Sequence, residues 1–336
     1  MSAGESLTYE PQSLEEQLDL FGLRPDEPLN LVGEAAPRGT KPRSEAKKSI
    51  QYMLEAAMQY GGVRDYVDLL DRVAALRQYK PFNALLVLLQ RPSATYLLPA
   101  HRWKERWGRV SRPNEQPLVM LQFRGPVMFL FDVSQTEAPD GARQLPVHLR
   151  NPYAMADVFS ADSALNWLTS NAKLDGVRVS VAGHGLPSAG CIWPSDQGMT
   201  QPTLVKKKPE TTERLPVRYE TLLNDAYSST ERLATLAHEL GHLYCGHIGT
   251  HDRELWPDRR GLSEPLQELE AESVARILFK RLAPDVELPA HLDQYFGNGQ
   301  PRPDADIERV LVAAGRVIEM SKGFAPRRSK KAAARL

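Results

Sequence analysis

The stretch HELGHLYCGH, residues 238–247, constrains this chain more than any other feature, because it combines two histidines four residues apart with an intervening glutamate. On an α-helix with 3.6 residues per turn, His238 and His242 lie on one face, about 6 Å apart along the axis. Two imidazoles in this arrangement can bind one Zn²⁺, and Glu239 is then placed to take a proton from a water on the metal. The surrounding LATLAHELGHLY predicts a largely buried helix, in which unpaired imidazoles and a carboxylate would be costly. A metal site is therefore favoured over two solvated histidines.

A catalytic zinc site requires a third protein ligand, and the spacing excludes one candidate. The extended motif HExxHxxGxxH would need glycine at 245 and histidine at 248, where the chain has Cys245 and Ile248. The other candidate is a carboxylate from the downstream segment LQELEAESVARIL. Its Glu268 and Glu272 are four residues apart and share one helix face, whereas Glu270 points about 200° around the helix. If Glu268 binds the metal, Glu272 can accept the second ring N–H of a ligand histidine and hold its tautomer.

Residues beyond the ligand pair support weaker predictions. His247 lies within a turn or two of the expected metal, so it is either a group that polarises a substrate carbonyl or a structural histidine. Tyr244 and Tyr295 are candidate donors to a transition-state oxyanion, and Cys245 is expected to pack rather than react. His184, in the glycine-rich VAGHGLPSAG, indicates a turn.

The segments TLAHELGHLYCGH and QELEAESVA together resemble the ImmA/IrrE family of zinc metallo-endopeptidases, over roughly residues 150–320. In that family, HExxH is followed on the next helix by a glutamate and, three residues later, an alanine, a pattern that Glu268 and Ala271 fit. Glu272 stands where many relatives have an asparagine or an acid. The resemblance implies Zn²⁺ as the cofactor, and it implies three metal ligands and a general base, which are His238, His242, Glu268 and Glu239 in that order.

Length and composition indicate a soluble globular protein of two domains. The chain has 336 residues, which exceeds the usual size of one domain, and its 42% apolar and 25% charged residues are ordinary. Only Cys191 and Cys245 occur, and MSAGESLTYE lacks the pattern of a secretory signal, so a reducing cytoplasm is expected. The longest apolar run, ALLVLL at 84–89, is far shorter than the roughly 20 residues that span a bilayer, so no membrane partner is expected.

Charge is distributed unevenly along the chain, although the net charge is zero. Residues 1–30 carry seven acids and one arginine, which predicts a disordered acidic arm over residues 1–40. Residues 38–112 hold fifteen lysines and arginines against six acids, and residues 322–336 hold six basic residues and no acid. The last of these segments predicts a disordered basic tail.

The segment HRWKERWGR, residues 101–109, alternates aromatic and basic side chains in a way that suits unpaired nucleic acid. Trp103 and Trp107 could stack on bases at about 1–3 kcal/mol each, and four cations could meet phosphates, namely Arg102, Lys104, Arg106 and Arg109. Two tryptophans four residues apart are equally well explained as core anchors. Residues 79–137, which include Asn83 and end in DVSQTE, are similar to the N-terminal single-stranded-DNA-binding domain of ArdC-type antirestriction proteins. That resemblance implies single-stranded DNA as a partner.

The hydrophobic patterns and turn residues predict an α+β fold. Helices are expected over about 44–60, 64–78, 81–90 and 160–176, the last capped by Ser160 or Asp162, and again from Ser228 or Ser229. A hairpin is expected from residues 117–123 and 127–133, with Arg124, Gly125 and Pro126 at its turn, and strands over 177–182, 189–194 and 215–220. With the two resemblances, these elements predict a small α+β domain at 41–140. They also predict a gluzincin-like metallopeptidase domain at 141–321, in which the HExxH helix and the glutamate helix pack beside a small sheet.

These inferences predict a zinc-dependent metallo-endopeptidase that hydrolyses a protein substrate. The metal would lower the pKa of a bound water toward about 7, Glu239 would accept its proton, and the hydroxide would attack the scissile carbonyl. A repressor or another DNA-associated protein is the expected substrate, with single-stranded DNA as a guide. The alternative is a single-stranded-DNA-binding antirestriction or accessory protein of a mobile element, in which the zinc site is structural or vestigial.

Overall fold

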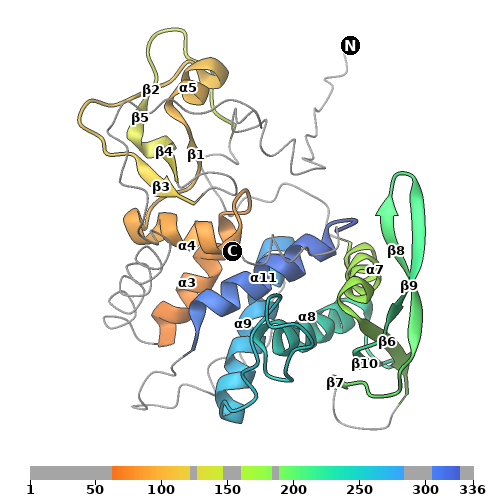
Figure 1. Ribbon diagram of the computed structural model, residues 1–336. Helices are drawn as coiled ribbons and strands as arrows, with labels where there is room; N and C mark the ends of the chain where they lie inside the picture. Colours follow the sequence, from red (N-terminus) through yellow and green to blue (C-terminus); the bar gives the residue numbers. More distant parts are fainter. Residues whose placement is uncertain (1–62, 122–126, 147–159, 184–188, 284–304, 326–336) are drawn as a thin grey trace, which may run out of the picture.

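The computed structural model describes residues 63–121, 127–146, 160–183, 189–283 and 305–325, which form a mixed α+β structure with small sheets (Figure 1). Its helices are α3 (Val63–Ala75), α4 (Pro81–Gln90), α5 (Ala100–Arg102), α7 (Ala161–Ala172), α8 (Ser229–Cys245), α9 (Glu264–Leu282) and α11 (Ile307–Ser321). Three single turns are η1 (Trp103–Trp107), η2 (Val133–Gln135) and η3 (Lys173–Asp175). Its strands are β1 (Leu97–Leu98), β2 (Val110–Ser111), β3 (Leu118–Met120), β4 (Met128–Asp132), β5 (Thr136–Glu137), β6 (Val177–Ala182), β7 (Gly190–Pro194), β8 (Thr200–Lys207), β9 (Glu210–Pro216) and β10 (Tyr219–Asn224).

One continuous hydrophobic core joins α3, α4, α7, α8, α9 and α11. Helix α8 contributes Leu233, Leu236, Leu240 and Leu243, which are fully buried and recur at three- and four-residue intervals along one side of the helix. Helices α9 and α11 pack against α8, and α3 and α4 pack in turn against α9 and α11 (Figure 1). The two helices from the N-terminal half therefore share a core with the helices that carry the predicted metal ligands. The division of the chain into domains at residue 140 stays a prediction.

A small antiparallel sheet of order β1-β4-β3 lies beside α4. Two side-chain amides of α4 bind the backbone of the β3 segment. Asn83 pairs with both the N–H and the C=O of Leu121, at 3.3 and 3.1 Å, and Gln90 does the same with Val119, at 2.8 and 2.9 Å. Backbone groups of a strand need partners, so these amides connect the sheet to the helical core. Asn83 thus has a structural role, because its side chain joins α4 to the β3 segment.

A second sheet of order β6-β10-β7 lies against α8, with β7 as an outer strand among the described residues. Strand β10 pairs in parallel with β6, where Tyr219 lies opposite Val177, and antiparallel with β7, where Glu220 lies opposite Trp193. Gly190 at the start of β7 allows the close approach of α8, because a Cβ there would lie 2.6 Å from Cγ2 of Thr235. The antiparallel ribbon β8–β9 extends from this end of the molecule (Figure 1).

Several predicted elements are confirmed and others are corrected. Helices are present at 63–75, 81–90 and 161–172, Ser160 caps the last of these, and β3 and β4 pair antiparallel as predicted. The strand predicted at 215–220 is wrong, because those residues span the end of β9, a two-residue connection and the start of β10. Strand β8 and helix α11 were not predicted.

Other predictions fall outside the described residues. These are the acidic arm at 1–40, the helix at 44–60, the hairpin turn at Arg124, Gly125 and Pro126, and the loop with His184. Of the predicted basic tail, residues 322–325 are described, and Asn171 on α7 binds the C=O of Gly323 at 2.6 Å and the N–H of Ala325 at 3.1 Å. The first residues of that segment therefore pack against α7. Among the helices that the structure describes, none has the length and apolar character needed to cross a bilayer.

Candidate metal centre

Helix α8 presents the HELGH motif in its C-terminal half. It begins with a capping box, in which the Ser228 hydroxyl accepts from the N–H of Glu231 and the Glu231 carboxylate accepts from the N–H of Ser228. Its leucines face the core, whereas the side chains of His238 and His242 are only partly buried, with 22% and 12% of their surface exposed. The two histidines therefore lie on an accessible face of a helix that is anchored by its other side.

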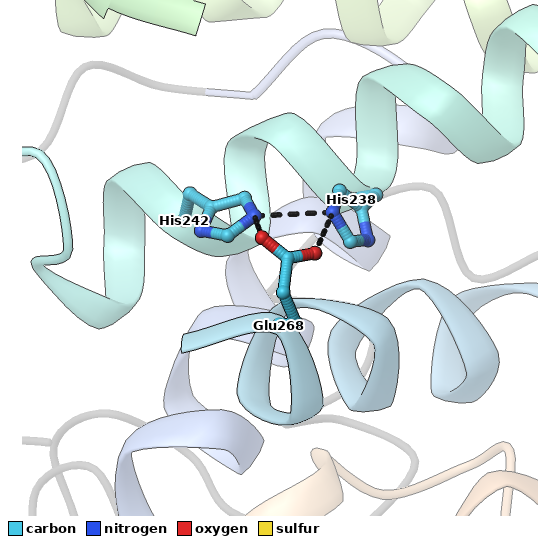
Figure 2. A group of neighbouring side chains, drawn as sticks. All are labelled: His238, His242 and Glu268. Atoms are coloured by element: carbon cyan, nitrogen blue, oxygen red, sulfur yellow. Dashed lines mark hydrogen bonds and ion pairs between the residues drawn. The ribbon is translucent and has the colours of Figure 1, made fainter. Parts of the chain in front are cut away.

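Glu268 on α9 completes a cluster of three groups that could hold a metal ion (Figure 2). Its two carboxylate oxygens lie 3.2 Å from Nε2 of His238 and 3.3 Å from Nε2 of His242, and the two Nε2 atoms are 3.0 Å apart. Glu268 has 32% of its side chain exposed, so the cluster is open to solvent on one side. Three donor atoms that converge in this way, from two helices, match the first requirement of a metal site with an open coordination position.

The carboxylates of this cluster favour a positive charge beside them. Burial alone would lower the pKa of His238, but hydrogen bonds to Glu268 and Glu272 raise it to about 10. The neighbouring imidazoles of His238 and His242 hold the pKa of Glu268 well below its usual range. Carboxylates thus outweigh burial and favour a positive charge at His238, which a proton supplies when no metal does.

Glu239 lies next to the cluster on the side of strand β7 and is almost fully buried, with 9% of its surface exposed. The pKa of Glu239 is raised to about 7. Burial and the charge of Glu268 raise this pKa, whereas the charge of His238 and a hydrogen bond with the backbone of Ile192 lower it. The contact with Ile192 places this carboxylate between α8 and β7. A buried carboxylate with this pKa can both take up and release a proton near neutral pH.

Each histidine of the cluster has a second partner on its other ring nitrogen. Nδ1 of His238 lies 3.2 Å from Glu272, as the four-residue spacing from Glu268 predicted. Nδ1 of His242 lies 3.0 Å from Nδ1 of His247. Sequence reasoning did not foresee the second contact, because it considered His247 only as a substrate-binding group or a structural residue.

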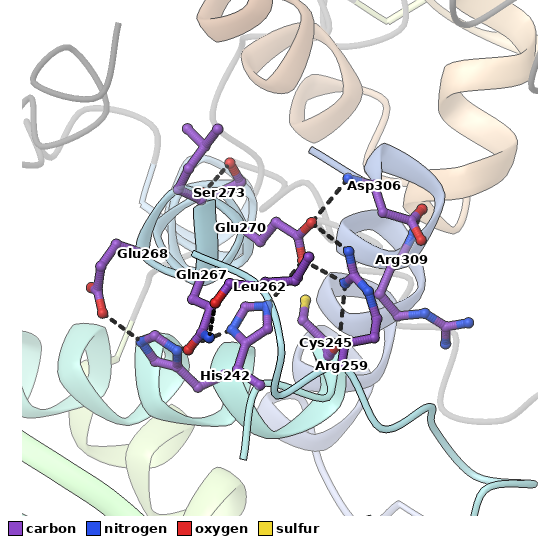
Figure 3. A network of polar contacts seen from close by, with 12 residues as sticks. His242, Cys245, Arg259, Leu262, Gln267, Glu268, Glu270, Ser273, Asp306 and Arg309 are labelled. Atoms are coloured by element: carbon purple, nitrogen blue, oxygen red, sulfur yellow. Dashed lines mark hydrogen bonds and ion pairs between the residues drawn. The ribbon is translucent and has the colours of Figure 1, made fainter. Parts of the chain in front are cut away.

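His247 belongs to a buried network on the opposite side of α9 from Glu268. Figure 3 shows that Glu268 leaves α9 toward His242, whereas Glu270 points to Arg259 and Asp306. The Glu270 carboxylate accepts two hydrogen bonds from the Arg259 guanidinium, at 2.6 and 2.8 Å, and one from the N–H of Asp306 at 2.9 Å. Nε2 of His247 lies 3.0 Å from the same carboxylate. The expectation that Glu270 points away from the metal therefore agrees with the structure.

Cys245, His247 and Glu270 form a second group with metal-ligand atoms close together, and all three are buried. The Arg259 guanidinium already supplies the positive charge beside Glu270, and both carboxylate oxygens have donors. Burial alone would raise the pKa of Glu270, but the hydrogen bonds from His247 and Arg259 lower it. Glu270 is therefore better described as a carboxylate paired with Arg259 and His247 than as a ligand of a second metal ion.

Two of the weaker predictions are corrected by burial. The His247 side chain has no exposed surface, so it cannot polarise a substrate carbonyl. Tyr244 is 1% exposed and donates its hydroxyl hydrogen to Asp175 at 2.8 Å, so its hydroxyl is not available to an oxyanion. Cys245 is fully buried, as its predicted packing role requires. Tyr295 lies outside the described residues.

The structure separates the two tryptophans of HRWKERWGR. Trp103 is fully buried and donates its indole N–H to the C=O of Phe131 at 2.7 Å, so it anchors a small core and cannot stack on a base. Trp107 is partly buried against that core, with the Arg106 guanidinium 5.8 Å from its ring centroid. The prediction of two stacking tryptophans is thus corrected for Trp103.

The four predicted cations of this segment also differ. Lys104 and Arg106 are exposed on η1. Arg109 donates to both the hydroxyl and the C=O of Thr136, at 2.8 Å each, and Arg102 lies 3.5 Å from Glu105. Of the four cations, those for which no side-chain hydrogen bond or ion pair is described are therefore Lys104 and Arg106.

Comparison with known proteins gave weak matches. No family model matches the chain, and no curated protein matches it. Two crystal structures of the antirestriction protein ArdC from plasmid R388 are similar, one Mn(II)-bound and one metal-free, each at 16% sequence identity and a TM-score of 0.35. The Mn(II)-bound match covers 72% of this chain and 85% of that one, and the metal-free match covers 76% and 94%. Such weak similarity establishes neither a shared activity nor membership of the ImmA/IrrE family.

Proposed function

We propose that this chain is a divalent-metal-dependent peptidase whose cofactor is Zn²⁺. The proposal depends on one observation above the others, which is the convergence of His238, His242 and Glu268 beside a buried Glu239. Two imidazole nitrogens and one carboxylate are the donor set of several catalytic zinc sites. When bound, the cation would supply Lewis-acid chemistry, by polarising a carbonyl and acidifying a water.

The chain's own residues have defined roles in this proposal. Glu239 accepts a proton from the attacking water and returns it to the nitrogen of the leaving group. Its burial favours the protonated form, and the charge of His238 favours the ionised form, so the two effects keep the carboxyl group able to work in both directions. Glu272 accepts the ring N–H of His238 and so orients that ligand.

Strand β7 supports a peptide as the substrate class. It is an outer strand of the described sheet, and Ile192 within it contacts Glu239. An outer strand can accept an extended peptide as a further strand, held by main-chain hydrogen bonds. A peptide bound along β7 would run past Glu239 and the three ligands. Trp193, with 40% of its surface exposed on this strand, offers an apolar contact for a substrate side chain.

The test is the substitution Glu239→Gln, which removes the proton acceptor and leaves the three ligands in place. We expect the variant to bind Zn²⁺ with the affinity of the unsubstituted protein and to lose cleavage. Glu264→Gln is the matched control, because Glu264 is exposed in the first turn of α9, and it should retain both properties. The assay uses purified full-length protein with an unfolded protein substrate and with DNA-binding proteins encoded nearby, with and without single-stranded DNA and a chelator. Full cleavage by Glu239→Gln would refute the proposal.

A second proposal concerns single-stranded DNA, and it is carried by the exposed Lys104 and Arg106 beside the half-buried Trp107. In it, the chain is a single-stranded-DNA-binding antirestriction or accessory protein, and the metal site serves stability alone. It predicts salt-dependent binding of single strands and no cleavage of any protein, with or without Zn²⁺. Loss of melting temperature on chelation, without any peptidase activity, would favour this second proposal over the first.

A further inference from the structure

The partner of His242 is set by the way helix α8 ends. Gly246 has a φ of 89° and donates its N–H to the C=O of Leu243 at 3.0 Å, and the next residue, His247, donates to the C=O of His242 at 2.9 Å. This pair of bonds is the Schellman arrangement, in which the chain folds back over the last turn. It places His247 directly over His242, with the two Nδ1 atoms 3.0 Å apart. Glycine is also required here because a Cβ at 246 would lie 2.3 Å from the C=O oxygen of Pro257.

Contacts run from His242 through His247 to the buried Glu270 carboxylate, and the positions of the hydrogens in them follow from that carboxylate. The Glu270 carboxylate faces three groups that can only donate, namely the two guanidinium nitrogens of Arg259 and the N–H of Asp306. A carboxylate in such company accepts, so Nε2 of His247 carries the hydrogen that points at it. In the neutral imidazole, Nδ1 of His247 is then an acceptor.

The same direction of hydrogen bonding extends from His247 to His242 in the cluster. Because Nδ1 of His247 accepts, Nδ1 of His242 must carry a hydrogen, which leaves the lone pair on Nε2 of His242. That Nε2 atom is the one that faces His238 and Glu268. A single direction of hydrogen bonding thus runs from His242 through His247 to Glu270, and it presents the correct nitrogen to a metal.

We propose that His247 and Glu270, with Arg259, form a relay that holds His242 in its metal-binding tautomer and orientation. His247 is a positioning residue, because it acts through His242 and touches neither the metal nor the substrate. The proposal rests on the metal site of the proposed function, but not on peptide cleavage. The relay is more fully buried than the contact on the other histidine, since the side chains of His247 and Glu270 are 0% exposed, whereas Glu272 beside His238 is 14% exposed.

The experiment measures Zn²⁺ affinity by competition with a chromogenic chelator, using full-length protein and Zn²⁺ alone. His247→Leu removes the acceptor for His242 and the donor to Glu270, and we expect it to weaken Zn²⁺ binding by about 10- to 100-fold. His247→Gln keeps one acceptor and one donor on the same side chain, so it should recover most of this loss. Ser273→Ala is the matched control, because Ser273 is buried on α9 and contacts Tyr66, outside the relay. It should bind Zn²⁺ like the unsubstituted protein.

A spectroscopic measurement separates positioning from packing. In ¹⁵N-labelled, Zn²⁺-loaded protein, nitrogen chemical shifts should show hydrogen on Nε2 of His247 and on Nδ1 of His242. The opposite tautomer of His247 would overturn the proposal, and this result does not require that any variant fold. Equal Zn²⁺ affinity of folded His247→Leu and unsubstituted protein would also overturn it. So would a second zinc per chain that is lost with His247, because His247 would then be a ligand.

Failure of the relay and failure of the peptidase proposal give different results. If Glu239→Gln abolishes cleavage while His247→Leu binds Zn²⁺ normally, the relay is wrong and the peptidase stands. If no protein is cleaved while His247→Leu binds Zn²⁺ weakly and His247→Gln recovers, the relay stands and the peptidase is wrong.

Discussion

Gly241, between the two histidines of the motif, is a position at which α8 and α9 lie very close together. A Cβ built there would lie 2.9 Å from Cα and 3.0 Å from the C=O oxygen of Ala271, where ordinary contacts begin at 3.4 Å. Gly241→Ala therefore has to open the helix pair by about 0.5 Å. Glu268 lies one turn before Ala271 on the same helix and would move with it. Ligand distances in metal sites vary by only about 0.2 Å, so this displacement exceeds what the site tolerates.

The cost of Gly241→Ala can be bounded from two opposing effects. Overpacking a buried contact costs about 1–3 kcal/mol, while replacing glycine by alanine within a helix contributes about 1 kcal/mol of stability. We therefore expect a net loss of about 0–2 kcal/mol in the free energy of unfolding, measured by urea denaturation. Zn²⁺ affinity should fall by about 10- to 100-fold, as it does when the groups that orient ligands are removed.

Gly315→Ala provides the matched control for this substitution. Gly315 lies within helix α11, and a Cβ there would meet only Cδ of Pro81, at an ordinary 3.5 Å. The control should gain up to about 1 kcal/mol in stability and leave Zn²⁺ affinity unchanged. If Gly241→Ala behaves like Gly315→Ala in both assays, the close crossing of α8 and α9 does not determine the geometry of the site.

Two further predictions concern pH and nucleic acid. Burial opposes protonation of His238, but hydrogen bonds to carboxylates favour it and raise the pKa of His238 to about 10. The proton on His238 therefore stabilises the metal-free fold fully below pH 6.5, and this stabilisation is lost as the pH rises through about 10. The melting temperature in a chelator should therefore fall across this range while Zn²⁺ affinity rises, because metal and proton compete; affinity that is constant between pH 6.5 and 9 would contradict this. Trp103→Leu should destabilise the fold and leave the salt dependence of single-strand binding unchanged, whereas Lys104→Ala and Arg106→Ala should each reduce that dependence by about one phosphate contact. Equal effects of all three substitutions would show that the buried tryptophan is part of the interface.

Local patterns predicted the central elements of the site well. The spacing of the leucines and the serine before the motif placed α8, and the four-residue spacing of Glu268 and Glu272 placed both on one face of α9. Helix α11 could have been predicted in the same way, since Ile307, Val310 and other apolar residues recur at helical spacing. Strand β9 was not, because six of its seven residues are exposed and it carries no alternation of apolar side chains. Its strand character comes from pairing with β8.

The buried network behind His242 could not be predicted by periodicity, because its members come from four separate segments. His247 follows α8, Arg259 lies in the connection to α9, Glu270 lies on α9, and Asp306 precedes α11. Helical spacing showed that Glu270 points away from Glu268, but it carried no information about what lies on that side. Only the packing of α8, α9 and α11 brings these groups together.

The ten residues of HELGHLYCGH therefore contain more of the site than the metal-binding motif alone. His238, Glu239 and His242 would be present in any sequence that matches HExxH, but the other residues decide whether the ligands converge. Gly241 allows α9 to come close enough for Glu268 to reach both histidines, and Gly246 turns the chain so that His247 returns to the back of His242. A protein with the motif but with larger residues at these two glycine positions should bind metal weakly, even though every ligand is in place. In the proposed relay, the last histidine of the stretch is thus neither a third ligand nor a bystander, because it would determine which nitrogen of His242 faces a bound metal.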